Sequence, residues 1–140
     1  MTATPPTPAR LITVGVLYGL AGFAAGFVMA PVRIMLLEPR IGPVAAVLVE
    51  VPVVLTVSFL AARWLVRRFV PGATPAQRAA LGTVAFMLLQ TAEFGLSLAM
   101  GDTPPSYAAK IAAPAGVIGI AAQVLFGLLP LIVNDPREQL

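Results

Sequence analysis

The chain has 140 residues, of which 59% are hydrophobic and 11% charged, and its formal net charge is +3. Soluble domains carry roughly a quarter of their residues as charged side chains, so this composition, with a mean hydropathy of +0.93, indicates an integral membrane protein. The chain contains no Cys and no His, which excludes disulfides, thiolate nucleophiles, and metal or haem sites built on those side chains. The basic residues lie at the edges of apolar segments, which indicates membrane orientation and not nucleic-acid binding.

Four apolar segments are each long enough for a span of about 20 residues, so they predict four transmembrane helices. We expect these helices over about residues 11–36, 44–68, 76–100 and 107–133. Residues 1–9 are predicted to be a disordered polar tail, and residues 134–140 a polar C-terminal tail. Residues 10–133 then form one transmembrane domain.

Glycines line one face of the first predicted helix. Gly15, Gly19, Gly22 and Gly26 recur at steps of three and four, and the same face continues to Arg33. Small residues on one face let helix backbones approach closely in lipid. The pattern predicts a helix-packing seam, and a glycine-lined substrate groove is the alternative.

Residues 33–43 are predicted to be an interfacial turn between the first two helices. Pro39, Gly42 and Pro43 are expected to stop the helix and turn the chain. Arg33 and Arg40 would then lie at headgroup level, where long basic side chains reach toward water.

The second predicted helix carries a carboxylate within its apolar run. Glu50 lies two residues before Pro52, which cannot donate to the carbonyl one turn earlier. A charged side chain at such a depth normally faces a partner, a cavity or a pathway. The helix ends at an aromatic and basic boundary, formed by Arg63, Trp64, Arg67 and Arg68.

The third and fourth predicted helices also carry polar groups. Gln90 and Glu93 lie on one polar face of the third helix, and Gln123 lies within a turn of the middle of the fourth. Lys110 begins near the outer surface, where it either reaches inward toward Glu93 or extends outward to the headgroups. A second small-residue seam on the fourth helix is predicted to include Ala112, Gly116, Gly119 and Gly127.

These segments predict an all-α four-helix membrane bundle in an up-down arrangement. Arginine and lysine are more frequent on the side that holds both termini, so the positive-inside rule places both termini in the cytoplasm. The excess of Arg over Lys, with abundant Ala, Gly and Pro, favours a bacterial source, and hence a multi-pass protein of the inner (plasma) membrane.

The polar residues are predicted to lie at a similar depth in the membrane, as judged from the rise of about 1.5 Å per residue in an α-helix. Glu50, Glu93, Gln90 and Gln123 fall near one level, and they are our candidate proton- or ion-binding residues together with Lys110. The alternative is that the carboxyl groups are neutral, hydrogen-bonded, and serve only helix association.

Three functions fit this pattern. The first is a proton- or cation-linked transporter or channel that works as a homo-oligomer. The second is a non-catalytic transmembrane subunit of a larger membrane complex, held through the two small-residue seams. The third, an intramembrane lipid enzyme, has little support, because no nucleophile with a base partner is visible. No residue pattern implies a cofactor or a metal ion, and the lipid bilayer is the one certain partner.

Overall fold

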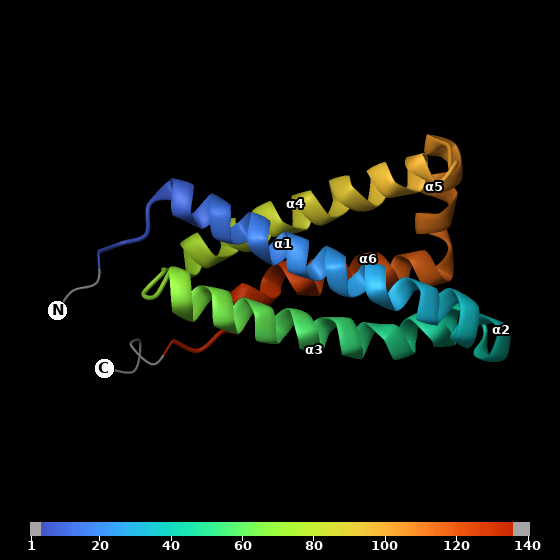
Figure 1. The fold of residues 1–140 in the computed structure, drawn as a ribbon, viewed down its shortest axis with the longest axis horizontal. Coiled ribbons are helices and arrows are strands. Elements are labelled where there is room, and N and C mark those ends of the chain that lie inside the picture. Colours follow the sequence, from blue (N-terminus) through green and yellow to red (C-terminus); the bar gives the residue numbers. More distant parts are fainter. Residues whose placement is uncertain (1–3, 136–140) are drawn as a thin grey trace.

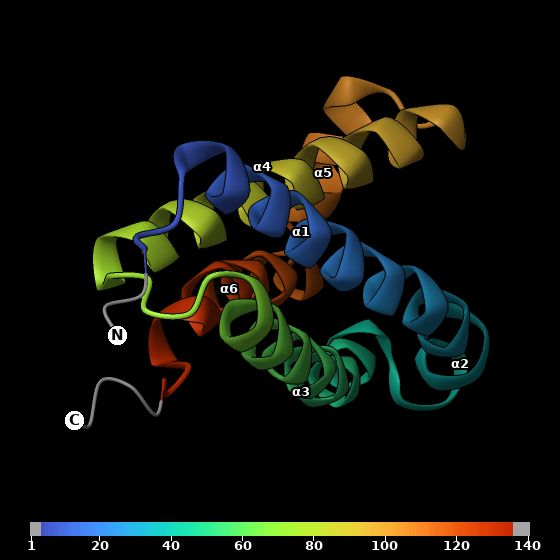
Figure 2. The same ribbon diagram turned by 60° about the vertical axis from the view of Figure 1, so that its left-hand side comes forward.

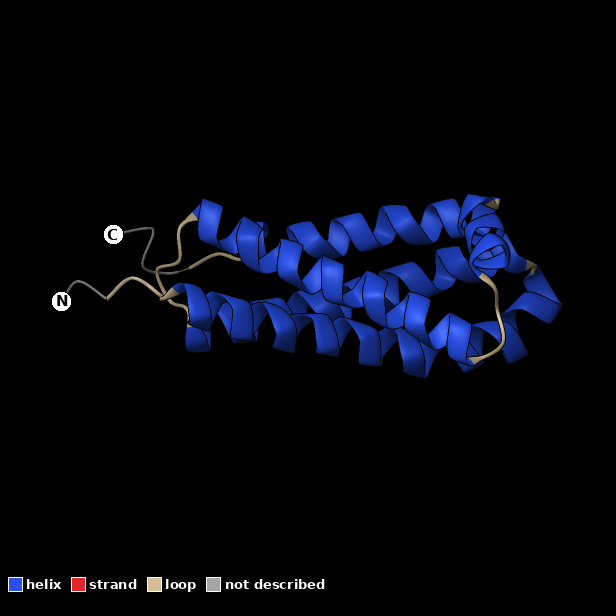
Figure 3. Cartoon of the chain, turned by 90° about the horizontal axis from the view of Figure 1, so that it is seen from above, coloured by secondary structure: helices blue, strands red, loops and turns tan. Residues whose placement is uncertain are grey.

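The computed structural model describes residues 4–135, and the described chain is helical, with no strands (Figure 3). It contains four helices that are long and apolar enough to cross a membrane, which marks the chain as a membrane protein. These candidate spans are Pro8–Ile41, Pro43–Phe69, Pro75–Ala99 and Pro114–Ile132.

The first span is longer than the sequence predicts. Helix α1 (Pro8–Pro31) begins after Thr7, whose side chain accepts a hydrogen bond from the backbone N–H of Arg10. It continues without a break through a π-helical segment, η1 (Val32–Leu37), into α2 (Glu38–Ile41). The chain turns only at Gly42, whose φ of 83° suits glycine.

Residues 33–41 are therefore helical, and the expectation of an interfacial turn beginning at Arg33 is wrong. Pro39 does not stop the helix; it lies at the junction between the π-helical segment and α2, where the backbone hydrogen-bond pattern changes. The π-helical turn before it is closed by the N–H of Glu38, which donates to the carbonyl of Arg33.

The next two helices follow the predicted bounds closely. Helix α3 (Pro43–Phe69) begins directly after Gly42, and a turn with Gly72 at φ 76° leads to α4 (Pro75–Ala99). Thr74 caps α4 in a reciprocal pair with Gln77, in which each side chain bonds the other residue's backbone.

The last predicted helix is two helices. Helix α5 (Pro104–Ala112) ends at Ala113, and α6 (Pro114–Leu128) begins immediately after it and continues as the 3-10 segment η2 (Leu129–Ile132). The break arises because a residue before proline disfavours the helical conformation. Ala113 is accordingly extended, with φ −67° and ψ 155°.

The long helices lie side by side along the long axis of the molecule (Figure 1). Helix α1 packs on α3 and α4, and α6 packs on the same two helices from the other side. We call the end that holds residues 4–7, Gly72 and residues 133–135 the terminal end. The opposite end, with Gly42 and Gly101, is the Gly42 end. Toward it, α2 and α5 lie well apart in both views (Figures 1 and 2).

The apolar core occupies the half of the molecule near the terminal end. Its fully buried members come from all four long helices and include Tyr18, Val66, Leu81 and Phe126. Toward the Gly42 end, beyond Leu89 of α4, the buried apolar residues of the described chain are Ala46 and Val47. The half near the terminal end is therefore tightly packed, and the half near the Gly42 end is more exposed and carries most of the described acidic side chains.

One hydrogen bond at the core explains why Tyr18 is fully buried. Its hydroxyl donates to the carbonyl of Phe126 over 2.6 Å, and the two rings stack with centroids 4.3 Å apart. The usual helical donor to that carbonyl is residue 130, which is proline and has no N–H. Tyr18 thus satisfies, from α1, an acceptor that Pro130 leaves open in α6, alongside the N–H of Leu129.

Candidate functional site

The polar residues predicted at one depth do lie at matched positions along their helices. Glu50 is seven residues from the start of α3, and Glu93 is six residues from the end of α4. Both therefore lie about 10 Å along the helix from the Gly42 end. Their carboxyl groups belong to the more open half of the molecule.

Arg33 is the charged partner of Glu50. Its Nε lies 2.6 Å from Oε2 of Glu50, and its Nη1 lies 2.5 Å from Oε1 of Glu38. Side-chain exposure is 25% for Arg33 and 15% for Glu50, so the pair is largely shielded. The guanidinium thus contacts both carboxylates, and Glu50 has a basic partner at this depth.

Glu93 sits at the end of a chain of amide groups. The Gln123 side-chain N–H donates to Oε2 of Glu93 over 2.6 Å, and the Gln90 N–H donates to the Gln123 carbonyl oxygen. Within residues 4–135, no Lys or Arg side chain forms an ion pair with Glu93. Glu93 is thus a carboxyl group within an apolar helix whose visible hydrogen-bond partner is a neutral amide.

Glu93 is within electrostatic reach of the Arg33–Glu50 pair, since both charges act on its carboxyl group. Tyr107 of α5 faces the same region, and its ring meets Phe94 edge-on, with centroids 5.0 Å apart. Burial, followed by the nearby charge of Glu93, raises the pKa of the Tyr107 phenol. The site therefore joins residues of α1 and its π-helical extension, α3, α4, α5 and α6.

Lys110 does not join this group. Its ammonium lies 2.7 Å from each carboxylate oxygen of Asp102, and its side chain is 65% exposed. The Ser97 hydroxyl also donates to Asp102. The Lys110 ammonium and the Ser97 hydroxyl together hold the pKa of Asp102 below its usual range. Of the two positions predicted for Lys110, the structure shows the outward one, with Asp102 as partner.

The glycines of the first predicted seam divide into two groups. A Cβ on Gly15, Gly19 or Gly22 would press on α4 or on the Phe126 ring, so these residues allow close packing inside the chain. Around Gly26, no atom lies within 4 Å of a Cβ position. Three of the four glycines are therefore used by the chain itself.

The second predicted seam makes fewer close contacts within the chain than the first. Gly127 lies close to Gly82 and Phe86 of α4, and Gly116 lies against the backbone of Lys110 and Ile111 at the break. Ala112 is exposed, and Gly119 has no neighbour within 4 Å of a Cβ position.

Sequence reasoning missed two participants, Arg33 and Tyr107. A signal for Arg33 was present, because it continues the glycine face of the first helix and so points into the bundle. For Tyr107, no signal was available, because its direction depends on the break at Ala113.

Two carboxyl groups therefore lie near each other. Glu50 forms an ion pair with Arg33, and Glu93 forms no ion pair among the described residues. An unpaired charge in an apolar setting is costly, so Glu93 favours taking up a proton or a cation. Compared with known proteins, the chain matches no family model, no curated protein and no solved structure.

Proposed function

We propose that this protein is a small membrane transporter or channel for a proton or a cation, in which Glu93 binds the ion. The observation that carries the proposal is the environment of Glu93. Its carboxyl group lies about 10 Å inside an apolar helix, accepts one hydrogen bond from Gln123, and has no ion pair among the described residues. Polar groups at such a depth mark ion or proton pathways.

The amide chain positions the carboxyl group and does not conduct protons. Carboxamide side chains offer fixed donors and acceptors and do not titrate. Because Gln90 donates to Gln123, the Gln123 amide is oriented with its N–H toward Glu93. One carboxyl oxygen of Glu93 is then fixed by a hydrogen bond, and the other is left for the proton or cation.

The Arg33–Glu50 pair has a different role in this proposal. Arg33 compensates Glu50, so the pair contributes a fixed charge distribution beside Glu93 and does not itself exchange ions. The sequence predicted that both Glu50 and Glu93 bind the ion. In this proposal Glu93 alone binds the ion, and Glu50 is a positioning residue.

For the membrane topology, we propose an up-down bundle with both termini on the cytoplasmic side of a bacterial inner membrane. The distribution of charge supports this orientation. The basic residues near the terminal end are Arg10, Arg63, Arg67, Arg68 and Arg78, with Asp135 as the single described acid there. Near the Gly42 end, Arg33, Arg40 and Lys110 are accompanied by Glu38, Glu50, Glu93 and Asp102.

Flux measurement tests the assignment of Glu93. Purified protein is reconstituted into liposomes that hold a pH-sensitive dye, and a proton gradient or a gradient of Na⁺ or K⁺ is imposed. The wild type should carry flux, and Glu93→Gln should abolish it, because the amide can neither bind nor release a proton. Glu38→Gln, at the same end, is the matched control and should keep most of the flux. Equal flux in the wild type and in Glu93→Gln would contradict the proposal.

A homo-oligomer is part of this proposal, because four helices enclose little volume and leave an ion pathway most readily between subunits. Gly26 and Gly119 support it, since no atom of the described chain lies within 4 Å of a Cβ position at either glycine. The same two glycines also fit the alternative function, a non-catalytic subunit docked on a larger membrane complex. The native mass after mild extraction separates the two, because unrelated larger chains would be present only in the second case.

A further inference from the structure

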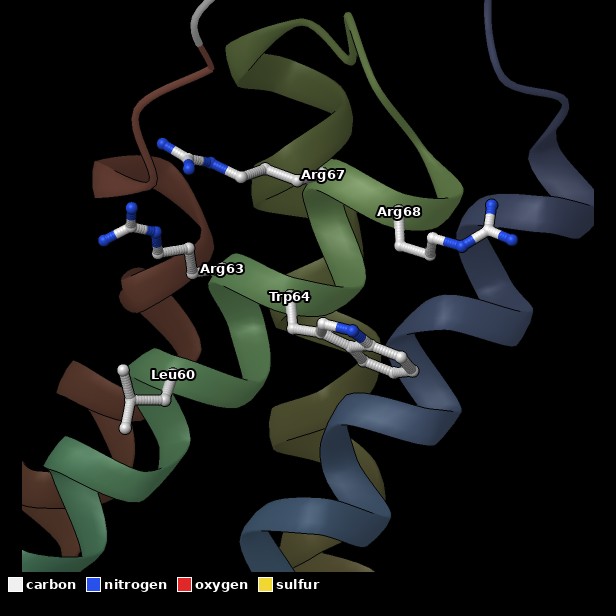
Figure 4. A pocket seen from close by; sticks show the side chains of 5 residues that line it. All are labelled: Leu60, Arg63, Trp64, Arg67 and Arg68. Carbon is white, nitrogen blue, oxygen red and sulfur yellow. The ribbon is translucent and has the colours of Figure 1, made fainter.

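Arginines gather at the end of α3 that lies near the terminal end of the molecule. Arg63, Arg67 and Arg68 surround Trp64, and Leu60 lies one turn earlier in the helix (Figure 4). These side chains border a surface depression of about 400 Å³. Trp64 is 61% and Leu60 is 57% exposed, so apolar and basic groups face outward together at the edge of a candidate span.

The side chains point to two different sides of α3. In Figure 4, Leu60, Arg63 and Arg67 point toward the side of the C-terminal segment, whereas Trp64 and Arg68 point toward α1. Arg63 and Arg67 are four residues apart, so they are neighbours on the helix surface. Arg68 instead lies over the ring of Phe69, with its guanidinium carbon 5.6 Å from the ring centre.

The two neighbouring arginines differ in how they are held. Arg67 donates from Nε and Nη2 to the carbonyl of Asn134, over 2.9 and 2.6 Å, which fixes its guanidinium and leaves Nη1 open. Arg63 has neither a hydrogen bond nor an ion pair with any residue in the range 4–135. A guanidinium fixed by two hydrogen bonds therefore stands beside one that has no ion pair within residues 4–135.

From this geometry we propose that Arg63 and Arg67 form a binding site for the phosphate of an anionic phospholipid. Guanidinium groups match phosphate oxygens well, often with two hydrogen bonds. The exposed Leu60 side chain, one turn toward the middle of the span, would lie along the first part of an acyl chain. A free phosphate ion would use the arginines but not Leu60, and the position at the membrane edge favours the lipid.

Lipid titration followed by native mass spectrometry tests the site on the full-length protein in detergent. Phosphatidylglycerol is compared with phosphatidylcholine of the same acyl chains, and inorganic phosphate is titrated separately. We expect tighter binding of phosphatidylglycerol, and Arg63→Gln should weaken it roughly fivefold, because a basic side chain near the surface contributes to anionic-lipid binding on that scale. Arg63 has no structural contact to lose, so this variant should fold normally.

Arg68→Gln is the matched control, since it removes the same charge from the same turn of the same helix but from the other side. Its lipid binding should fall clearly less than that of Arg63→Gln, because the Arg68 guanidinium lies over Phe69 on the side of α1 and outside the Arg63–Arg67 pair. Equal binding of the two lipids by the wild type would overturn the proposal, and so would equal losses in Arg63→Gln and Arg68→Gln. Inorganic phosphate that binds as tightly as the lipid would show a free-anion site, and the lipid assignment would be wrong.

Discussion

At the scale of single residues, proline determines where a polar side chain is needed. Pro130 leaves the Phe126 carbonyl without its helical donor, and Tyr18 supplies a donor from a helix more than a hundred residues earlier in the chain. The missing N–H was visible in the sequence. The identity of the group that replaces it was not, because it depends on how α1 and α6 face each other.

Tyr18→Phe tests this pairing. The substitution removes the hydroxyl and keeps the ring stack with Phe126, so it should lower the free energy of unfolding in mixed micelles by about 1 kcal/mol. The loss stays modest because the N–H of Leu129 also reaches the Phe126 carbonyl. In a Pro130→Ala background, which restores a backbone donor, Tyr18→Phe should cost less than half as much. An equal cost in both backgrounds would contradict the role given to Pro130.

Asp102 provides a second test at this scale. Because the Lys110 ammonium and the Ser97 hydroxyl lower the pKa of Asp102, its carboxylate stabilises this turn at pH values above the ordinary Asp pKa of about 3.9. That contribution is lost as the pH falls through the lowered pKa. Titration followed by carboxyl-carbon NMR should place the Asp102 midpoint below that of an ordinary Asp. Lys110→Gln should raise the midpoint; an unchanged midpoint would refute the Lys110 contact.

At the scale of helices, the sequence was most informative about length and least informative about contact. Apolar runs predicted the four long helices, but Pro39 was expected to stop a helix, and the helix expected over about residues 107–133 included Pro114 without a break. Pro39 lies at the junction between the π-helical segment and α2, whereas Pro114 forces Ala113 out of the helix. Glu38, before Pro39, keeps helical dihedral angles, whereas Ala113, before Pro114, is extended. One proline therefore lies within a continuous helix, and the other begins a new helix.

Glycine packing between helices gives a prediction at this scale. A Cβ on Gly82 would collide with the carbonyl oxygen of Gly127, so α4 and α6 would have to separate. Gly82→Ala should therefore lower the free energy of unfolding by roughly 1–3 kcal/mol. Gly95→Ala, in the same helix, meets open space and should leave stability within about 0.5 kcal/mol of the wild type. Denaturation in mixed micelles measures both, and equal effects would show that the close approach is not formed.

At the scale of the whole molecule, a packed half supports a polar half. The depth of Glu50, Glu93, Gln90 and Gln123 was predictable, because helical rise is fixed and the apolar runs set the ends. Which of these residues touch was not predictable, because contact depends on the rotation of each helix against its neighbours. Arg33 illustrates this, since α1 and its extension stay helical to Ile41, which places Arg33 beside Glu50 and not in the predicted turn.

The division of the two carboxylates between charge compensation and ion binding is the central claim. The most direct measurement compares flux in liposomes for Glu93→Gln and for the double variant Arg33→Gln with Glu50→Gln, which removes the shielded Arg33–Glu50 pair and leaves Glu38, whose side chain is 28% exposed, as the remaining carboxylate beside it. We expect no flux in Glu93→Gln and measurable flux, altered in rate, in the double variant. Flux that survives in Glu93→Gln and disappears in the double variant would contradict this claim and would assign ion binding to Glu50.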